Sequence, residues 1–133
     1  MENHIRLFTV EEANALLPEL EKILKRFDQK KRISEKMHDE LLMEELLCGS
    51  SSSAVSKSFL EEEAARLDQA LSAIESEIHA IRALGCKVRF LSKGWVDFPA
   101  QRGEMVVFFV WKRGEDAVRY YREVEDPLQL LPL

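Results

Sequence analysis

The feature that most constrains this chain is a heptad repeat of apolar residues within residues 59–84. The repeat runs at spacings of four and three through Leu60, Ala64, Leu67, Leu71, Ile74, Ile78 and Ile81. Such spacing puts the side chains on one face of a helix and is typical of helices that pack by knobs-into-holes contacts. Ser58 is a candidate N-cap and Gly85 a candidate C-terminal stop. The repeat therefore predicts a long helix that needs an apolar partner.

Residues 9–47 are predicted to supply that partner as a second helical segment. Thr9-Val10-Glu11-Glu12 has the form of a capping box, and apolar residues then recur at helical spacing. Because a proline disfavours helical geometry at the residue before it, we expect a break near Pro18. Residues 48–58 are rich in serine and are predicted to form a flexible loop between the helices.

The last third of the chain changes to the period of two that is typical of strands. Residues 86–91 alternate, residues 105–111 are apolar throughout, and residues 117–123 alternate again after a predicted turn at 112–115. Because of Pro99, residues 95–99 are predicted to form a loop or a short edge strand. Residues 124–133 are predicted to be a tail that docks on the rest of the chain. The predicted fold is α+β, with a long antiparallel helical hairpin followed by a small antiparallel sheet of three to four strands at 86–123.

An antiparallel hairpin around the serine-rich loop pairs positions whose numbers sum to about 105. This pairing sets Met37 near Leu67 and Ser34 near Leu71, and it favours ion pairs from Lys30 or Lys31 to Glu75. A helix over 59–84 would be about 40 Å long, whereas a compact chain of this length has a radius of gyration of about 14 Å. A small sheet cannot cover such a helix, so we expect a two-fold homodimer with a four-helix core.

Composition narrows the class of protein. A chain of 133 residues is expected to form a single domain, 1–133, and the net charge of −5 argues against general nucleic-acid binding. The sequence has no run of 18 apolar residues, so no membrane span is predicted. The first residues lack the apolar core of a signal peptide. Cys48 and Cys86 are outside any CxxC motif and are expected to be reduced thiols. Together these features predict a cytoplasmic location.

Metal and cofactor sites are not predicted. Glu35 and His38 have the E-x-x-H spacing of di-metal helical bundles, but the hairpin pairing sets His38 opposite the apolar Leu67. The other pair, Glu75 and His79, falls about 15 Å further along the helices. The chain also lacks nucleotide-binding glycine loops and nucleophile motifs. We therefore expect no metal, no cofactor and no assigned catalytic residue.

The sheet segment contains the residues that are most suggestive of a ligand site. Arginine, aromatic and acidic side chains cluster near its loops and strand ends: Asp97, Arg102, Trp111, Arg113, Glu115, Tyr121 and Arg122. Arginine and aromatic residues are enriched at binding hot spots. The alternative is that the aromatic residues belong to the core and the charges are solvated.

The position of these residues around the apolar strand suggests a shared pocket. Asp97 precedes the strand and Trp111 to Glu115 follow it. The strand is about 23 Å long, so the two groups start from its opposite ends. They can meet if the chain between Pro99 and Met105 runs back along the strand, or if a two-fold axis joins two subunits. We favour the two-fold arrangement, in which Asp97 approaches Arg113 or Arg122 of the partner. The alternative is that Asp97 caps a turn and Glu115 is solvated.

Three segments carry a resemblance to a known family. They are residues 6–18 (RLFTVEEANALLP), residues 94–100 (GWVDFPA) and residues 111–115 (WKRGE). In this order they resemble the bacterial domain-of-unknown-function 2203 family, which implies a small cytoplasmic protein and supplies no activity. Family members often carry an aromatic-His-Glu sequence in the last strand, then a tail with glycine and arginine. This chain has Tyr121-Arg122-Glu123 and then Val124-Glu125-Asp126-Pro127. Arg122 stands where those members have the histidine, so any function of that histidine is not expected here.

Three hypotheses for function follow. The first is a non-enzymatic interaction or scaffold protein built on the dimeric hairpin, with a possible protein partner. The second is a small-ligand-binding module or small enzyme at the sheet loops, near the dimer interface. The third, which we regard as unlikely, is nucleic-acid binding through the local basic cluster of Lys25, Arg26, Lys30, Lys31 and Arg32, because glutamates surround it.

Overall fold

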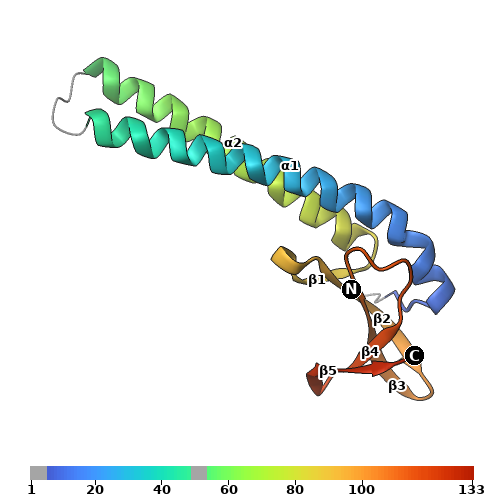
Figure 1. Cartoon of the computed structure of the whole chain (residues 1–133). Coiled ribbons are helices and arrows are strands. Elements are labelled where there is room, and N and C mark those ends of the chain that lie inside the picture. Colours follow the sequence, from blue (N-terminus) through green and yellow to red (C-terminus); the bar gives the residue numbers. More distant parts are fainter. Residues whose placement is uncertain (1–5, 49–53) are drawn as a thin grey trace, which may run out of the picture. The chain divides into compact units, whose positions relative to one another are not determined.

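The computed structural model describes residues 6–48 and 54–133. Two helices come first, α1 (Val10–Cys48) and α2 (Ala54–Ala83), and they run side by side in opposite directions (Figure 1). Five strands follow: β1 (Lys87–Phe90), β2 (Trp95–Arg102), β3 (Met105–Lys112), β4 (Tyr120–Glu123) and β5 (Asp126–Pro132). A short 3-10 helix, η1 (Leu91–Lys93), joins β1 to β2. The predicted α+β fold, a helical hairpin followed by a small antiparallel sheet, is confirmed.

Two compact units make up the chain. The sheet unit is Met1–Leu24 with Ile78–Leu133, and the hairpin unit is Lys25–Glu77. The predicted loop 48–58 lies partly outside the described residues, and its part from Ala54 onward is helical, so α2 begins earlier than residue 59. No helix in the described ranges has a segment apolar and long enough to cross a membrane.

The core of the sheet unit lies between the start of α1 and one side of the sheet. Ala13, Leu17 and Leu20 are buried together with Phe98 and Trp111. The predicted capping box starts α1 as expected, since the Glu12 amide donates to Thr9 Oγ1 at 3.1 Å and the Thr9 amide donates to Glu12 Oε1 at 3.0 Å. Gly85, with φ of 96°, follows the end of α2 and donates its N–H to the Arg82 carbonyl at 2.9 Å, as predicted for a C-terminal stop.

The predicted break at Pro18 is wrong, because α1 continues through it. An internal proline costs about 3 kcal/mol. Its neighbour Leu17 and the nearby Leu20 are buried, and each fully buried leucine contributes about 1.5–3 kcal/mol. The segment is also fixed from the sheet side, because Asn14 Oδ1 accepts from the Val118 amide at 2.8 Å. Burial and this tie offset the cost of the proline.

The hairpin unit has the predicted register. Ser34, His38, Leu67 and Leu71 line one groove between the helices, which agrees with the predicted pairing of positions summing to about 105. The heptad face is rotated, however. Within the hairpin unit, the less exposed positions of α2 are Leu60, Glu63, Leu67, Ala70, Ala73, Ile74 and Glu77, whereas Ala64 and Leu71 are exposed. The apolar repeat is thus only partly covered by α1.

Glu77, rather than the predicted Glu75, makes the ion pairs between the helices. Arg26 Nε lies 2.9 Å from Glu77 Oε1, and Lys30 Nζ lies 3.2 Å from Glu77 Oε2. Glu77 lies on the inner face of α2 and is buried, while Glu75 is exposed. Burial opposes the charged form of Glu77, but the hydrogen bonds from Arg26 and Lys30 outweigh it and lower the pKa of this carboxyl.

The sheet has the order β1-β2-β3-β4-β5, and every neighbouring pair is antiparallel. It has five strands rather than three to four, because residues 95–102 form an inner strand and residues 126–132 of the expected tail form β5. Pro99 is tolerated inside β2 because its carbonyl accepts from the Phe8 amide at 2.7 Å, on the side away from β3. Its missing N–H points to that same side, so no bond between β2 and β3 is lost.

Candidate functional site

The β2–β3 hairpin brings the two sequence motifs of the sheet together within one chain. Its tight turn at Gly103 and Glu104 reverses the chain, so that Val96 pairs with Trp111 and Asp97 with Val110. The favoured arrangement, in which a two-fold axis joins these motifs, is therefore wrong, and the alternative, in which the chain after Pro99 runs back along the strand, is the one present. The physical reason is that β2 extends beyond Pro99, which allows the chain to run back along β3 at once.

Alternation along the strands divides their residues between the two sides of the sheet. Val96 and Phe98, with their partners Trp111 and Phe109, belong to the core that packs on α1. Asp97 lies on the opposite side of the sheet. Arg122 of β4, which pairs with Phe108 of β3, lies on the same side as Asp97.

On this opposite side, Asp97 forms a buried ion pair with Arg122 of its own chain. The side chain of Asp97 is 0% exposed, and its Oδ2 accepts from Arg122 Nε at 3.2 Å and from Arg122 Nη2 at 2.8 Å. Arg89 of β1 approaches the same oxygen, with its Nε at 3.7 Å. The cluster of Arg89, Asp97 and Arg122 thus holds two positive charges and one negative charge. The expected contact of Asp97 with an arginine is present, but it needs no partner subunit.

Arg89 also shows that the sheet is curled around this cluster. β1 and β5 are at opposite edges of the sheet, yet Arg89 Nη1 donates to the carbonyl of Pro127 in β5. The two edges can approach each other only if the sheet bends with the cluster on its inner side. Irregular pairing in β1 after Val88 and in β4 after Tyr121 marks the places where bending is expected.

The electrostatics of the cluster are those of charges held away from water. Burial lowers the pKa of Arg89, the Asp97 carboxylate raises it and the Arg122 charge lowers it, with a net lowering. Arg89 Nε, Arg89 Nη2 and Asp97 Oδ1 are buried without a hydrogen-bond partner in the structure. The cluster contains no nucleophile, and Asp97 accepts through Oδ2 from Arg122. Its geometry therefore supports a role in holding the curled sheet together.

The remaining predicted residues separate into small local contacts. Trp111 is in the core and donates from Nε1 to the carbonyl of Glu115 at 2.9 Å. Glu115 Oε1 in turn accepts from the Lys112 amide at 2.9 Å. The Trp111–Glu115 segment thus closes its own turn, and this contact explains the motif structurally.

Two arginines of the predicted set lie elsewhere. Arg113 Nε is 3.7 Å from Glu21 Oε2 of α1. Arg102 stacks its guanidinium 4.4 Å from the ring centre of Tyr121. The predicted residues therefore form four separate contacts, and only Asp97 and Arg122 meet as the shared-pocket hypothesis requires.

Sequence reasoning missed a second group on the sheet, which we call the cation patch: Arg89, Lys93 and Lys112 around the rings of Phe90 and Trp95. The rings meet edge to face at 5.3 Å, and all three cationic groups lie within 4.5–5.6 Å of the Trp95 ring centre. Trp95 pairs with both Phe90 and Lys112 across the sheet. The signal in the sequence was the presence of two basic residues, Arg89 and Lys93, next to Phe90 and Trp95.

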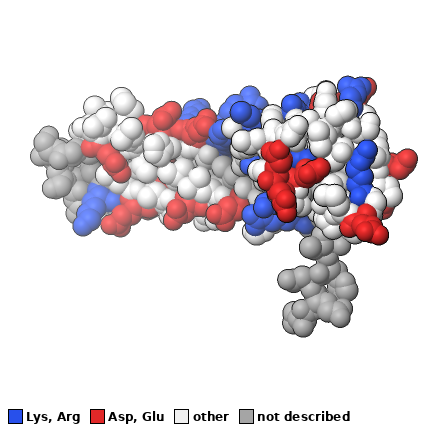
Figure 2. All heavy atoms as spheres, turned by 90° about the horizontal axis from the view of Figure 1, so that it is seen from below, with Lys and Arg blue, Asp and Glu red and all other residues white. Residues whose placement is uncertain are grey.

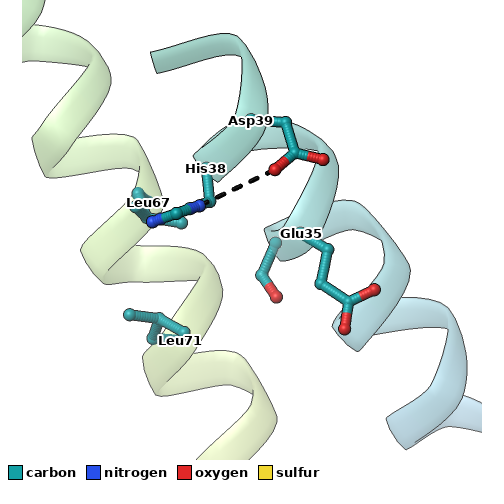
Figure 3. Close-up of a pocket in the computed structure, with 6 residues that line it drawn as sticks. Glu35, His38, Asp39, Leu67 and Leu71 are labelled. Carbon is teal, nitrogen blue, oxygen red and sulfur yellow. Dashed lines mark ion pairs between the residues drawn. The ribbon is translucent and has the colours of Figure 1, made fainter. Parts of the chain in front are cut away.

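The hairpin unit has a groove of its own, of about 220 Å³ (Figure 3). It is lined by Ser34, Glu35, His38 and Asp39 of α1 and by Leu67 and Leu71 of α2. His38 lies beside Leu67, as the helical pairing predicted, and its Nδ1 is 3.8 Å from Asp39 Oδ1. In the described part of the chain, no group of three or more His, Cys, Asp and Glu side chains is arranged to hold a metal ion.

Comparison with known proteins identifies the family. No curated protein and no solved structure matches the chain. One family model, described as "Uncharacterized conserved protein (DUF2203)", matches residues 6–129. That range covers both helices and nearly the whole sheet, and it includes the three segments that suggested the resemblance. The chain belongs to the DUF2203 family.

Proposed function

We propose that this protein is a non-enzymatic interaction protein whose hairpin unit pairs with the hairpin unit of a second copy. The observation that carries the proposal is the apolar surface that remains exposed on the hairpin unit. Leu71 is 46% exposed, Leu42 47% and Leu46 71%. Large side chains exposed together in this way are typical of interaction sites.

These leucines continue the groove of Figure 3. His38, Leu42 and Leu46 are spaced by four residues and therefore follow one another along one side of α1. Ala64, Leu67 and Leu71 do the same along α2 at spacings of three and four. The result is an apolar row with acidic neighbours such as Glu35 and Asp39. Figure 2 shows a face of the helices on which uncharged atoms lie between acidic side chains.

Charge segregation along the hairpin unit favours a second copy in antiparallel orientation. Residues 33–48 and 57–72, at the loop end, hold three Lys or Arg against nine Asp or Glu. Residues 25–32 and 73–77, at the other end, hold five basic against three acidic side chains. A two-fold axis across the hairpin sets each acidic end against a basic end, whereas parallel pairing sets acidic against acidic. The heptad repeat, only half covered by α1, supplies the apolar contacts of a four-helix core.

Sedimentation velocity of the purified chain tests the proposal. Burial of the exposed parts of three leucines per copy, six in all, offers about 6 kcal/mol, so we expect a dimer with a dissociation constant of tens of micromolar. Leu71→Asp should give a folded monomer, because it sets a charge in the new interface while Leu71 is half exposed in the single chain. The matched control is Ile33→Asp, which is 55% exposed but about 140° around α1 from His38 and should still form the dimer.

Salt and spin labels test the orientation. Screening should weaken an antiparallel dimer and strengthen a parallel one. A spin label on Glu45→Cys, with Cys48 and Cys86 replaced by serine, should report two distant labels in the antiparallel dimer. Monomeric wild type, or equal effects of Leu71→Asp and Ile33→Asp, would contradict the proposal.

The proposal has two further parts. A cytoplasmic location is supported by cysteine usage, since Cys86 is a free, buried thiol. A protein partner other than a second copy would use the same apolar row. Small-ligand binding at the sheet is the second candidate function, and the cation patch is the observation that favours it.

A further inference from the structure

The cation patch gathers positive charge that the chain itself does not neutralise. Residues 85–113 contain six Lys or Arg and only Asp97 and Glu104 as acids. Within the described residues, no carboxylate forms an ion pair with Lys93 or Lys112. Each nearby acid already has a partner for one oxygen: Asp97 Oδ2 accepts from Arg122, and Glu115 Oε1 accepts from a backbone amide. Asp97 Oδ1 has no hydrogen-bond partner, but Asp97 is fully buried.

Three cations around one ring repel one another. Arg89, Lys93 and Lys112 lie 5.3, 5.6 and 4.5 Å from the Trp95 ring centre. Any two of these charges are therefore at most about 11 Å apart, a distance comparable to the Debye length of about 8 Å at physiological salt. The ring attracts each cation, but it carries no net charge that would cancel their repulsion. Two buried donor atoms of Arg89, Nε and Nη2, lack a hydrogen-bond partner, against one buried acceptor, Asp97 Oδ1, so donors exceed acceptors beneath the patch. An anion beside Lys93 and Lys112 would relieve this repulsion.

We infer that the cation patch binds the phosphate group of a small organic phosphate, contacted by Lys93 and Lys112. Two ammonium groups match the charge of a phosphate monoester, and Arg89 adds positive charge behind them. Phe90 is 38% exposed beside Lys93 and offers an apolar contact for the organic part. The acidic hairpin unit and the net charge of −5 oppose a long polyanion, so a small ligand is favoured over nucleic acid. This inference does not depend on dimer formation.

Intrinsic fluorescence and calorimetry on the whole chain test the inference with three probes: adenosine monophosphate, inorganic phosphate and adenosine. Trp95 is in the patch, whereas Trp111 is in the core on the other side of the sheet, so binding should change the Trp95 signal. We expect adenosine monophosphate to bind with a dissociation constant of about 1 mM or lower, inorganic phosphate to bind more weakly, and adenosine not to bind. Trp95→Phe should remove the fluorescence change while calorimetry still detects binding.

Matched lysine variants localise the site. Lys93→Gln and Lys112→Gln should each weaken binding about tenfold, Lys93→Arg should retain most of it, and Lys25→Gln, on the hairpin unit, should leave it unchanged. Melting curves confirm that the variants fold. Three results would overturn the inference: no binding at about 10 mM ligand, equal affinity of the Lys25, Lys93 and Lys112 variants, or a single-stranded oligonucleotide bound through the same lysines more than tenfold tighter than the monophosphate.

Discussion

Replacing Asp97 by asparagine should destabilise the sheet unit more than any surface substitution. Asp97 is fully buried and is the carboxylate that both Arg122 and Arg89 approach, at 2.8 and 3.7 Å. Asparagine keeps the size but removes the charge, which leaves two nearly buried guanidinium groups facing each other. Removing one partner of a buried ion pair typically costs about 3–5 kcal/mol. Since domains are stable by about 5–15 kcal/mol, this loss is a large fraction of the total.

Urea unfolding followed by Trp111 fluorescence measures this loss. With a slope of about 1.5 kcal/mol per molar urea, the midpoint should fall by about 2–3 M. Asp116→Asn is the matched control, because Asp116 also pairs with an arginine, Arg119, at 2.7 Å but is 81% exposed. That variant should change the free energy of unfolding by less than about 0.5 kcal/mol.

A second substitution tests the cause of the loss. If stranded charge is the reason, adding Arg122→Met to Asp97→Asn should recover part of the stability, because one of the two unpaired cations is removed. A loss below about 1 kcal/mol for Asp97→Asn, or a further loss in the double variant, would refute the reasoning that the cluster holds the curled sheet together.

Three further measurements test other parts of the structure. The folded protein lowers the pKa of Glu77, so Glu77 contributes stability that is present above its ordinary pKa of 4.5 and is lost as the pH falls below that value. Glu77→Gln should therefore show a weaker acid transition, measured by helical circular dichroism. Its free energy of unfolding at pH 7 should be lower by about 1–3 kcal/mol. In Cys48→Ser, the thiol of Cys86, whose pKa burial raises to about 12, should react with a thiol reagent at pH 8 only after unfolding, and fast native labelling would contradict its burial. Asn14→Ala should lower the melting stability by about 1–3 kcal/mol, because it leaves the half-buried amide of Val118 unpaired, and an unchanged melting temperature would mean that water replaces the bond.

The helices were predictable because their signals are local and periodic. Heptad spacing indicated the long helix, and the position of the serine-rich loop gave the pairing that sets His38 opposite Leu67. The choice of Glu77 over Glu75 was not predictable in this way, because it depends on a small rotation of α2 that the apolar positions alone do not define. Pro18 was misread since its cost is local, while the burial that offsets it comes from strands about 80 residues later.

The sheet was predicted less well than the helices. Pro99 indicated an edge strand or a loop at residues 95–99. Whether a proline is tolerated inside a strand depends on the side to which its nitrogen points, and that side is set only by the pairing with β3 and Phe8. Asp97 and Arg122 were both selected from the sequence, but their meeting within one chain required the order of strands. Arg89 reaches Asp97 from the neighbouring strand, because Lys87, two residues earlier in β1, is the pairing partner of Asp97. Its bond to Pro127 depends on the curl of the sheet, and curling leaves no periodic signal in the sequence.

The two outer strands have a consequence for how copies of this protein can associate. An unpaired strand edge invites another chain to add to it, which is a common route to aggregation. Here β5 carries Pro127 and Pro132, which have no N–H to donate, and the carbonyl of Pro127 is already occupied by Arg89. The other outer strand, β1, has only four residues and ends in a helical turn. Growth of the sheet from molecule to molecule is thus discouraged at both ends, and the chain can expose leucines on its helices without also offering a template for fibrils.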